Sequence, residues 1–161
     1  MWQTLLSVVV GGILAIGGGI AQQWWQRRQD RRSLAYALAG EIGAIIESIE
    51  LRRYTEAIDG TIEQVKKTGT PWTFTIDIAE GYFLVYGANA GKIGLLSPLL
   101  AKEVAAFYSM MVGLIEDVAP RNNVRARTVE QSLAQLTQTR DLGLRTLQRG
   151  KALVALLEQV N

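Results

Sequence analysis

The feature that most constrains this chain is an apolar run of seventeen residues, 5–21, close to its N-terminus. Trp2 precedes the run, and Trp24 and Trp25 follow it. In a helix, the distance from Trp2 to Trp25 is about 35 Å, which matches a hydrocarbon core of about 30 Å plus its interfaces. Tryptophan rings prefer those interfaces. The pattern therefore predicts a transmembrane anchor over residues 1–26.

The charges beside the run predict its orientation. No Lys or Arg precedes it, whereas four arginines follow it at once: Arg27, Arg28, Arg31 and Arg32. Because basic residues favour the cytoplasmic side, we expect the N-terminus outside and the rest of the chain in the cytoplasm. Residues 27–33 would form a basic juxtamembrane segment at the lipid headgroups. A cleaved signal peptide is the alternative, but its positive charge would precede the apolar stretch.

The remaining residues, 34–161, have the length of one cytoplasmic domain. The chain contains no cysteine and no histidine, which excludes disulfide frameworks, Cys/His zinc sites and His-based catalytic triads. Residues 33–161 hold thirteen basic and fourteen acidic side chains, so the basic excess belongs to the juxtamembrane segment. A nucleic-acid partner is therefore not expected.

Apolar spacing predicts an all-α fold, an antiparallel helical bundle behind a single transmembrane helix. No Gly or Pro lies between Ile20 and Ala39, so the anchor can continue into a first helix that ends near Lys67. That helix has an apolar residue at nearly every third or fourth position: Leu34, Leu38, Ile42, Ile45, Ile49, Tyr54, Ile58, Ile62 and Val65. Glycines 40, 43 and 60 would permit close packing or a bend.

Further helices are predicted after a loop over residues 68–75. Asp77 and Glu80 resemble a capping box that begins a short helix, with Gly91 and Gly94 as terminators. Ser97-Pro98 predicts the start of the next helix, which ends before Pro120. Its core seam has heptad-like spacing: Leu100, Val104, Phe107, Met111, Leu114 and Val118.

The last helix is expected within residues 123–161, on a less regular apolar stripe that Arg140, Gly143 and Gly150 interrupt. Residues 121–161 carry a net charge of +4, and residues 33–120 carry −5. We therefore expect the basic last helix to lie along the acidic first one, although each exposed ion pair contributes only about 0 to 1 kcal/mol.

Small residues recur along one face of the anchor. This predicted helix-association face consists of Ser7, Gly11, Gly12, Ala15, Gly18 and Gly19. Small side chains let helix backbones approach closely in lipid, where van der Waals contact drives association. The face could meet a second copy of the chain or another protein, and glycine in a span can also be merely tolerated.

No catalytic, cofactor-binding or metal-binding residue is predicted. Residues 87–92 have glycines and a lysine, but their spacing does not fit a phosphate-binding loop. The acidic residues of the first helix are expected on a solvated face. An aromatic group is expected to pack between the short helix and the seam helix, or else to line a ligand pocket: Tyr82, Phe83, Tyr86, Phe107 and Tyr108.

The stretch 86–108, with Lys92-Ile93-Gly94-Leu95-Leu96 and then Phe107-Tyr108, resembles a pattern in small uncharacterised bacterial membrane proteins. These have one N-terminal transmembrane helix and a cytoplasmic helical domain. The resemblance implies fold and topology, here in the bacterial inner membrane, and brings no activity or cofactor with it.

The function expected from these features is that of a non-enzymatic scaffold or accessory protein. Its partners would be membrane lipid and either copies of itself or a larger membrane complex. Two alternatives are a membrane-active effector of the defence or lysis type, which oligomerises, and a helical signal-sensing receptor.

Overall fold

A computed structural model describes residues 2–76, 81–120 and 128–160, with side chains from residue 19 onward except at Ala21. These residues form helices and no strand, as expected for the all-α class. The elements in chain order are α1 (Trp2–Leu51), α2 (Tyr54–Thr68), α3 (Leu84–Asn89), the 3-10 helix η1 (Ala90–Leu95), α4 (Pro98–Val118) and α5 (Val129–Glu158).

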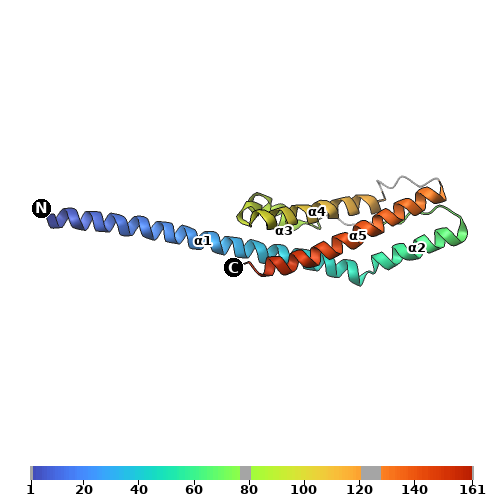
Figure 1. The fold of residues 1–161 in the computed structure, drawn as a ribbon, viewed down its shortest axis with the longest axis horizontal. Coiled ribbons are helices and arrows are strands. Elements are labelled where there is room, and N and C mark those ends of the chain that lie inside the picture. Colours follow the sequence, from blue (N-terminus) through green and yellow to red (C-terminus); the bar gives the residue numbers. More distant parts are fainter. Residues whose placement is uncertain (1, 77–80, 121–127, 161) are drawn as a thin grey trace.

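Helix α1 is a single helix of 50 residues, which corresponds to a length of about 75 Å. Its N-terminal half extends far beyond the bundle, and its C-terminal half lies within it (Figure 1). Burial begins at Leu34 and Ala35, and residues 22–30 are exposed. One rigid element therefore joins the predicted anchor to the bundle.

The first helix does not run to Lys67, as the spacing predicted, but breaks at residues 52–53. Arg53 lies in the left-handed region at φ 52°, and α2 starts at the next residue. The step from Ile49 to Tyr54 is five residues, which would turn an unbroken helix by about 140° and rotate its apolar face away from the core. The break restores that face. Helix α2 then ends at Thr68, with Gly69 at φ 62° as its C-cap.

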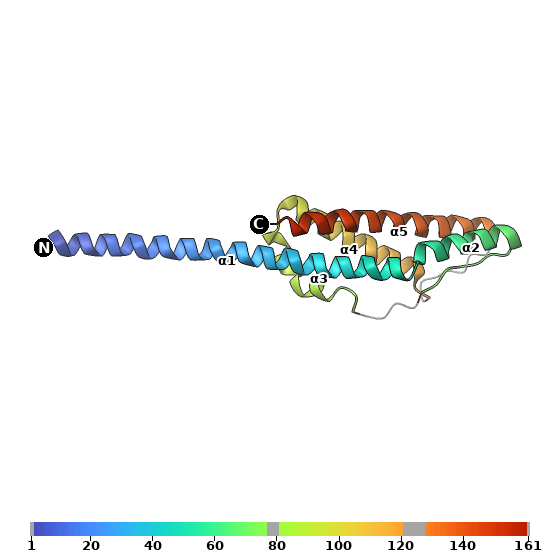
Figure 2. The same cartoon turned by 90° about the horizontal axis from the view of Figure 1, so that it is seen from below.

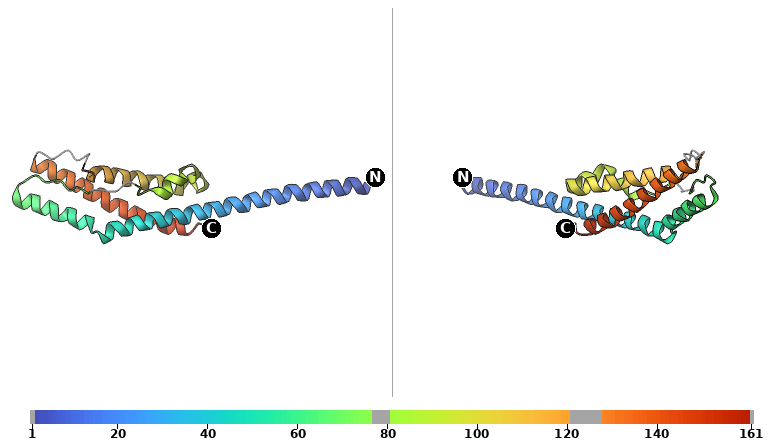
Figure 3. Two further views of the ribbon diagram at one scale, coloured as in Figure 1. Left: turned by 180° about the vertical axis from the view of Figure 1, so that it is seen from behind. Right: turned by 45° about the vertical axis from the view of Figure 1, so that its right-hand side comes forward.

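Helix α5 lies at the centre of the bundle, antiparallel to α1, α2 and α4 (Figure 2). Views from other sides show α4 on one side of α5 and α1 with α2 on the other (Figure 3). The larger core cluster joins α1, η1, α4 and α5. The smaller one joins α2 to the first half of α5 through Ile58, Ile62, Val65 and Leu136.

Side chains of α1 and α4 pack tightly against α5 at Gly150, which is buried. A Cβ atom at this position would lie 2.7 Å from Phe107 Cε2 and 2.8 Å from Ile46 Cδ1. The glycines that the sequence suggested for close packing, Gly40 and Gly43, have nothing within 4 Å of such an atom, and the same is true of glycine 60. The close-packing part of that expectation was wrong, because no atom of a neighbouring helix lies near those positions.

The start of α4 agrees with its sequence signals. The Ser97 hydroxyl accepts a hydrogen bond from Leu100 N, Pro98 occupies the first turn, and the helix ends at Val118. The proposed glycine terminators are not confirmed, because Gly91 and Gly94 lie inside η1. The capping box of Asp77 and Glu80 lies outside the described residues.

Candidate functional site

The juxtamembrane part of α1 stands clear of the bundle. Trp24 and Trp25 are exposed, and the guanidinium carbon of Arg28 lies 6.0 Å from the centre of the Trp24 ring. Burial begins nine residues after Trp25, which corresponds to about 14 Å of helix. Within this interval lie the predicted interface residues Arg27, Arg28, Arg31 and Arg32. An interface at the tryptophans would thus place the bundle directly beneath the headgroups.

The helix-association face remains a prediction. Ser7, Gly11, Gly12, Ala15 and Gly18 belong to the helical part of α1, but their side-chain environment lies outside the described residues, as does that of Trp2. At Gly19 an added Cβ would meet nothing within 4 Å. The described part of this face is therefore open to a neighbouring helix.

Among the residues whose side chains the structure describes, one helix is long and apolar enough to cross a membrane, and this helix is α4. In the structure α4 is one layer of the bundle (Figure 1). Val104, Phe107, Met111 and Val118 of its predicted seam are buried, and the remaining two, Leu100 and Leu114, are partly buried against the same core. The side chains of residues 2–18 lie outside that set, so the N-terminal span is still a prediction.

Glu41 of α1 was expected on a solvated face, and this expectation was wrong. Its Oε1 atom accepts a hydrogen bond from Val85 N at 2.7 Å. Its Oε2 atom accepts two, from Tyr86 N at 3.0 Å and from the Tyr108 hydroxyl at 2.5 Å. The carboxylate thereby joins α1 to the first turn of α3 and to α4. The other acidic residues of the group are exposed: Glu47, Glu50, Glu56, Asp59 and Glu63.

Aromatic rings enclose this carboxylate contact. Tyr108 stacks on Tyr86 with 3.9 Å between ring centres and meets Phe83 and Phe107 edge-on. The expected packing between the short helix and α4 is confirmed for these four residues, whereas Tyr82 lines a cavity instead. Burial, together with the hydrogen bond to Glu41, raises the pKa of Tyr108 far above its usual range. The tyrosine therefore stays a neutral hydrogen-bond donor.

The basic last helix pairs with acidic groups on three neighbouring helices, as the charge pattern predicted. The pairs are Lys151 with Glu50 of α1, Arg140 with Asp59 of α2, and Arg149 with Glu103 of α4. Arg149 binds Glu103 through two contacts, of 2.8 and 3.0 Å. The Arg140 contact, at 3.3 Å, lacks hydrogen-bond geometry and leaves Arg140 Nε without a hydrogen-bond partner in the described structure. These pairs favour one arrangement of the helices more than they stabilise it.

The sequence reasoning missed the buried polar residues of α5. Ser132, Thr139 and Thr146 are buried, in line with Gly150 at heptad-like intervals. Ser132 Oγ accepts from Trp72 N at 2.9 Å and donates to Trp72 O, which holds the segment after α2 against α5. Thr146 Oγ1 donates to Leu142 O. Their spacing of seven, seven and four residues was the available signal, but an apolar-only pattern overlooks it.

Among the described residues, no three acidic side chains gather in a way that could hold a metal ion. Residues 87–92 lie in α3 and η1, which are helical, and do not form a phosphate-binding loop. A function of the described residues would therefore depend on exposed surfaces, on the part of α1 that extends beyond the bundle, or on cavities.

Comparisons with known proteins found no match: no family model, no curated protein and no solved structure is similar to this chain.

Asp117, at the end of α4, provides a pH-dependent test of this fold. Burial, and secondarily the charge of Glu116, raises the pKa of Asp117. A raised folded-state pKa means that ionisation of Asp117 destabilises the fold, so the contribution of this group to stability is most favourable below pH 3.8 and becomes less favourable as pH rises through the folded pKa. Asp117→Asn should therefore stabilise the protein at pH 7 by about 0.3–1 kcal/mol, since it also removes a negative charge from a helix C-terminus.

Thermal unfolding of Asp117→Asn and the parent protein at pH 7 and pH 3 measures this effect. The difference in Tm should be present at pH 7 and vanish at pH 3. Glu116→Gln is the control, because its exposed side chain should give a smaller gain. Equal gains at both pH values would show that ionisation of Asp117 is not the cause.

Proposed function

We propose that this protein is a non-enzymatic, membrane-anchored assembly protein of the bacterial inner membrane. The N-terminal half of α1 spans the membrane with its N-terminus outside, and the bundle lies in the cytoplasm. The small-residue face of the span associates with another helix. The bundle then holds its partners, either copies of itself or subunits of a larger complex, at a set distance from the lipid.

The observation that carries this proposal is the continuity of α1. The helix runs without interruption from Trp2 to Leu51, and the same helix supplies buried residues of the core from Leu34 onward. A helix without a hinge transmits the rotation and tilt of the span directly to the bundle. Association of two spans would thus set the relative orientation of the two cytoplasmic domains. This is the mechanical property that a scaffold needs.

The arginines support the same proposal. Residues 22–30 are exposed and lie between the apolar run and the first buried residues. Each Lys or Arg near an anionic leaflet contributes about 1 kcal/mol. Four arginines at this level would therefore hold the helix at a fixed depth and keep the bundle close to the headgroups.

The test is the intact mass of the full-length protein extracted from its native membrane in a mild detergent. The variant Gly11→Leu/Ala15→Leu/Gly19→Leu blocks the small-residue face with bulky side chains, and its particle should be smaller than that of the parent. The control variant Val9→Leu/Ile13→Leu/Ile20→Leu changes the opposite side of the same helix, at the same number of positions. Its particle should keep the parental mass.

An unchanged particle in the first variant would remove the span from the assembly mechanism. A parental particle that is a multiple of 17.7 kDa would identify a homo-oligomer. Other polypeptides in the particle would instead identify an accessory subunit.

One observation favours a second candidate function, that of a membrane-active effector. Helix α4 is long and apolar enough to cross a membrane, and only 22% of the residues in its most apolar stretch are buried in the bundle. In this alternative, clustered chains would insert α4 next to the anchor. Purified protein reconstituted in dye-loaded vesicles would then cause leakage that rises steeply with protein density. Intact vesicles at high density would exclude this function.

A further inference from the structure

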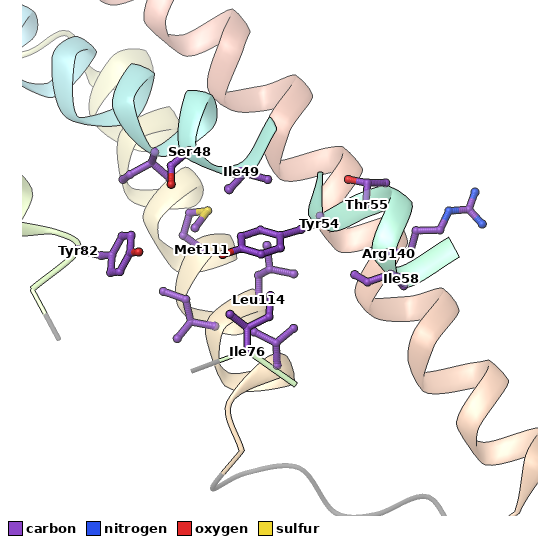
Figure 4. A pocket seen from close by; sticks show the side chains of 14 residues that line it. Ser48, Ile49, Tyr54, Thr55, Ile58, Ile76, Tyr82, Met111, Leu114 and Arg140 are labelled. Carbon is purple, nitrogen blue, oxygen red and sulfur yellow. The ribbon is translucent and has the colours of Figure 1, made fainter. Parts of the chain in front are cut away.

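The bundle encloses an apolar cavity of about 70 Å³ between α1, α2, α4 and α5 (Figure 4). Side chains from all four helices line it, among them Ile49, Tyr54, Met111 and Leu114. A cavity of this size could hold water, but water needs two to four polar partners, and the wall is almost wholly apolar. The cavity therefore suits a small apolar group better than water.

A second, more open pocket of about 290 Å³ adjoins this cavity. Ile45, Ser48 and Tyr82 line both spaces, and the outer pocket adds Glu41 and Gly81. In Figure 4, Ser48 and Tyr82 lie on the left-hand side of the cavity, and both residues also line the outer pocket. The two spaces therefore form one site, which consists of an apolar inner cavity and an outer pocket that contains a carboxylate.

Glu41 is the charged residue among those that line the outer pocket, and at the cavity wall the Arg52 guanidinium donates a hydrogen bond to the Tyr54 hydroxyl. Glu41 receives its three hydrogen bonds from neutral donors, two backbone N–H groups and a tyrosine hydroxyl, so its charge is not cancelled by them. Among the described residues no ion pair to Glu41 is formed. Arg140 also borders the inner cavity, but its guanidinium group pairs with Asp59 of α2 and points away from the cavity (Figure 4).

From this arrangement we propose that the site binds a small amphipathic cation. The apolar part of the ligand lies in the inner cavity against Met111 and Leu114, and its protonated amine lies in the outer pocket near Glu41. A carboxylate can accept about four hydrogen bonds, and the donors already present use three of these positions. The head of the ligand would therefore complete the set. This site does not depend on the scaffold function proposed above.

Three six-carbon compounds with the same chain test the proposal: n-hexylamine, n-hexanol and hexanoate. The readout is the NMR signal of ¹³C-labelled methionine methyl groups in the full-length protein, held in lipid nanodiscs. Met111 lines the cavity and its neighbour Met110 does not, so the second methionine is an internal control. Hexylamine should shift the Met111 signal saturably and leave Met110 unchanged. It should bind at least tenfold more tightly than hexanol, and hexanoate should bind most weakly.

Two variants separate the parts of the site. Gly143 lines the cavity, and a Cβ atom there would make only an ordinary contact, at 3.9 Å from Leu114 Cδ1. Gly143→Leu should therefore fill the cavity, keep or raise the Tm, and abolish the Met111 titration. Glu41→Gln should reduce the tenfold preference for the amine over the alcohol to about one. Glu47→Gln, an exposed change on the same helix, should keep that preference.

Several results would overturn the proposal. These are the absence of a saturable Met111 shift with hexylamine, equal binding of the amine and the carboxylate, and unaltered binding in folded Gly143→Leu. The comparison of the three compounds uses the parent protein, so it decides the matter even where Glu41→Gln fails to fold.

Discussion

Replacing Gly150 with leucine is expected to destabilise the bundle by about 3 kcal/mol, because the position has no room for a side chain. Even a single Cβ atom would lie 2.7 Å from the ring of Phe107 and 2.8 Å from the end of Ile46. Phe107 is completely buried, so its ring cannot move aside into solvent. Leucine would force the side chains of α1 and α4 away from α5 at this position. Chemical denaturation of the full-length protein in one fixed detergent measures the loss.

The matched control uses alanine at two glycines of the same helix. In an open helix, Gly→Ala stabilises by about 0.8–1 kcal/mol. Gly143→Ala should give a gain of this order, because its Cβ atom would make an ordinary contact at 3.9 Å. Gly150→Ala should destabilise by about 1 kcal/mol, since steric overlap outweighs the same gain in helix propensity. If both alanine variants are stabilised, the close approach at Gly150 does not exist in solution.

Replacing Glu41 with alanine is expected to destabilise the protein by a similar amount, about 3 kcal/mol. The change leaves three donors without their acceptor: Val85 N, Tyr86 N and the hydroxyl of Tyr108. Each buried donor left unpaired costs about 1–3 kcal/mol, and Tyr108 is only 2% exposed. Water can reach the start of α3 more easily, which keeps the total near the cost of one or two such groups. Urea unfolding of the full-length protein measures the effect.

Glu47→Ala is the control for this prediction, because Glu47 lies on the same helix and is exposed. Its change should stay within about 0.5 kcal/mol of the parent. The double variant Glu41→Ala/Tyr108→Phe should be less destabilised than the sum of the two single variants, because the second change removes one unpaired donor. Full additivity would mean that the carboxylate and the tyrosine do not interact in solution.

If Gly150→Leu and Glu41→Ala behave as expected, they show which contacts attach the other helices of the bundle to α1. Gly150 sets the spacing at which α1 and α4 cross α5, and Glu41 joins α1 to α3 and α4. Both contacts act on the half of α1 that continues directly from the proposed span. Loosening them would uncouple the bundle from the membrane helix without changing any residue of the span. This separation allows assembly in the membrane and orientation of the bundle to be studied independently.

The sequence by itself determined the helical class, several element boundaries and the charge relation between helices. These features depend on local chemistry. Ser97 and Pro98 start α4, and Gly69 ends α2, because capping and left-handed geometry are decided by a few neighbouring residues. The pairing of the basic α5 with acidic neighbours was predictable for a different reason. Net charge is a property of whole segments and does not require exact registers.

Tertiary structure alone decided which individual residues of those helices matter. The neighbouring residues in the sequence do not distinguish Glu41 from Glu47, and only the arrival of Tyr108 from a distant helix makes Glu41 a partly buried acceptor. In the same way, Gly150 resembled an interruption of an apolar stripe, yet side chains of both α1 and α4 pack against α5 at this position. Whether a polar or small side chain faces water or the core depends on what packs against it. That information lies in residues far away along the chain.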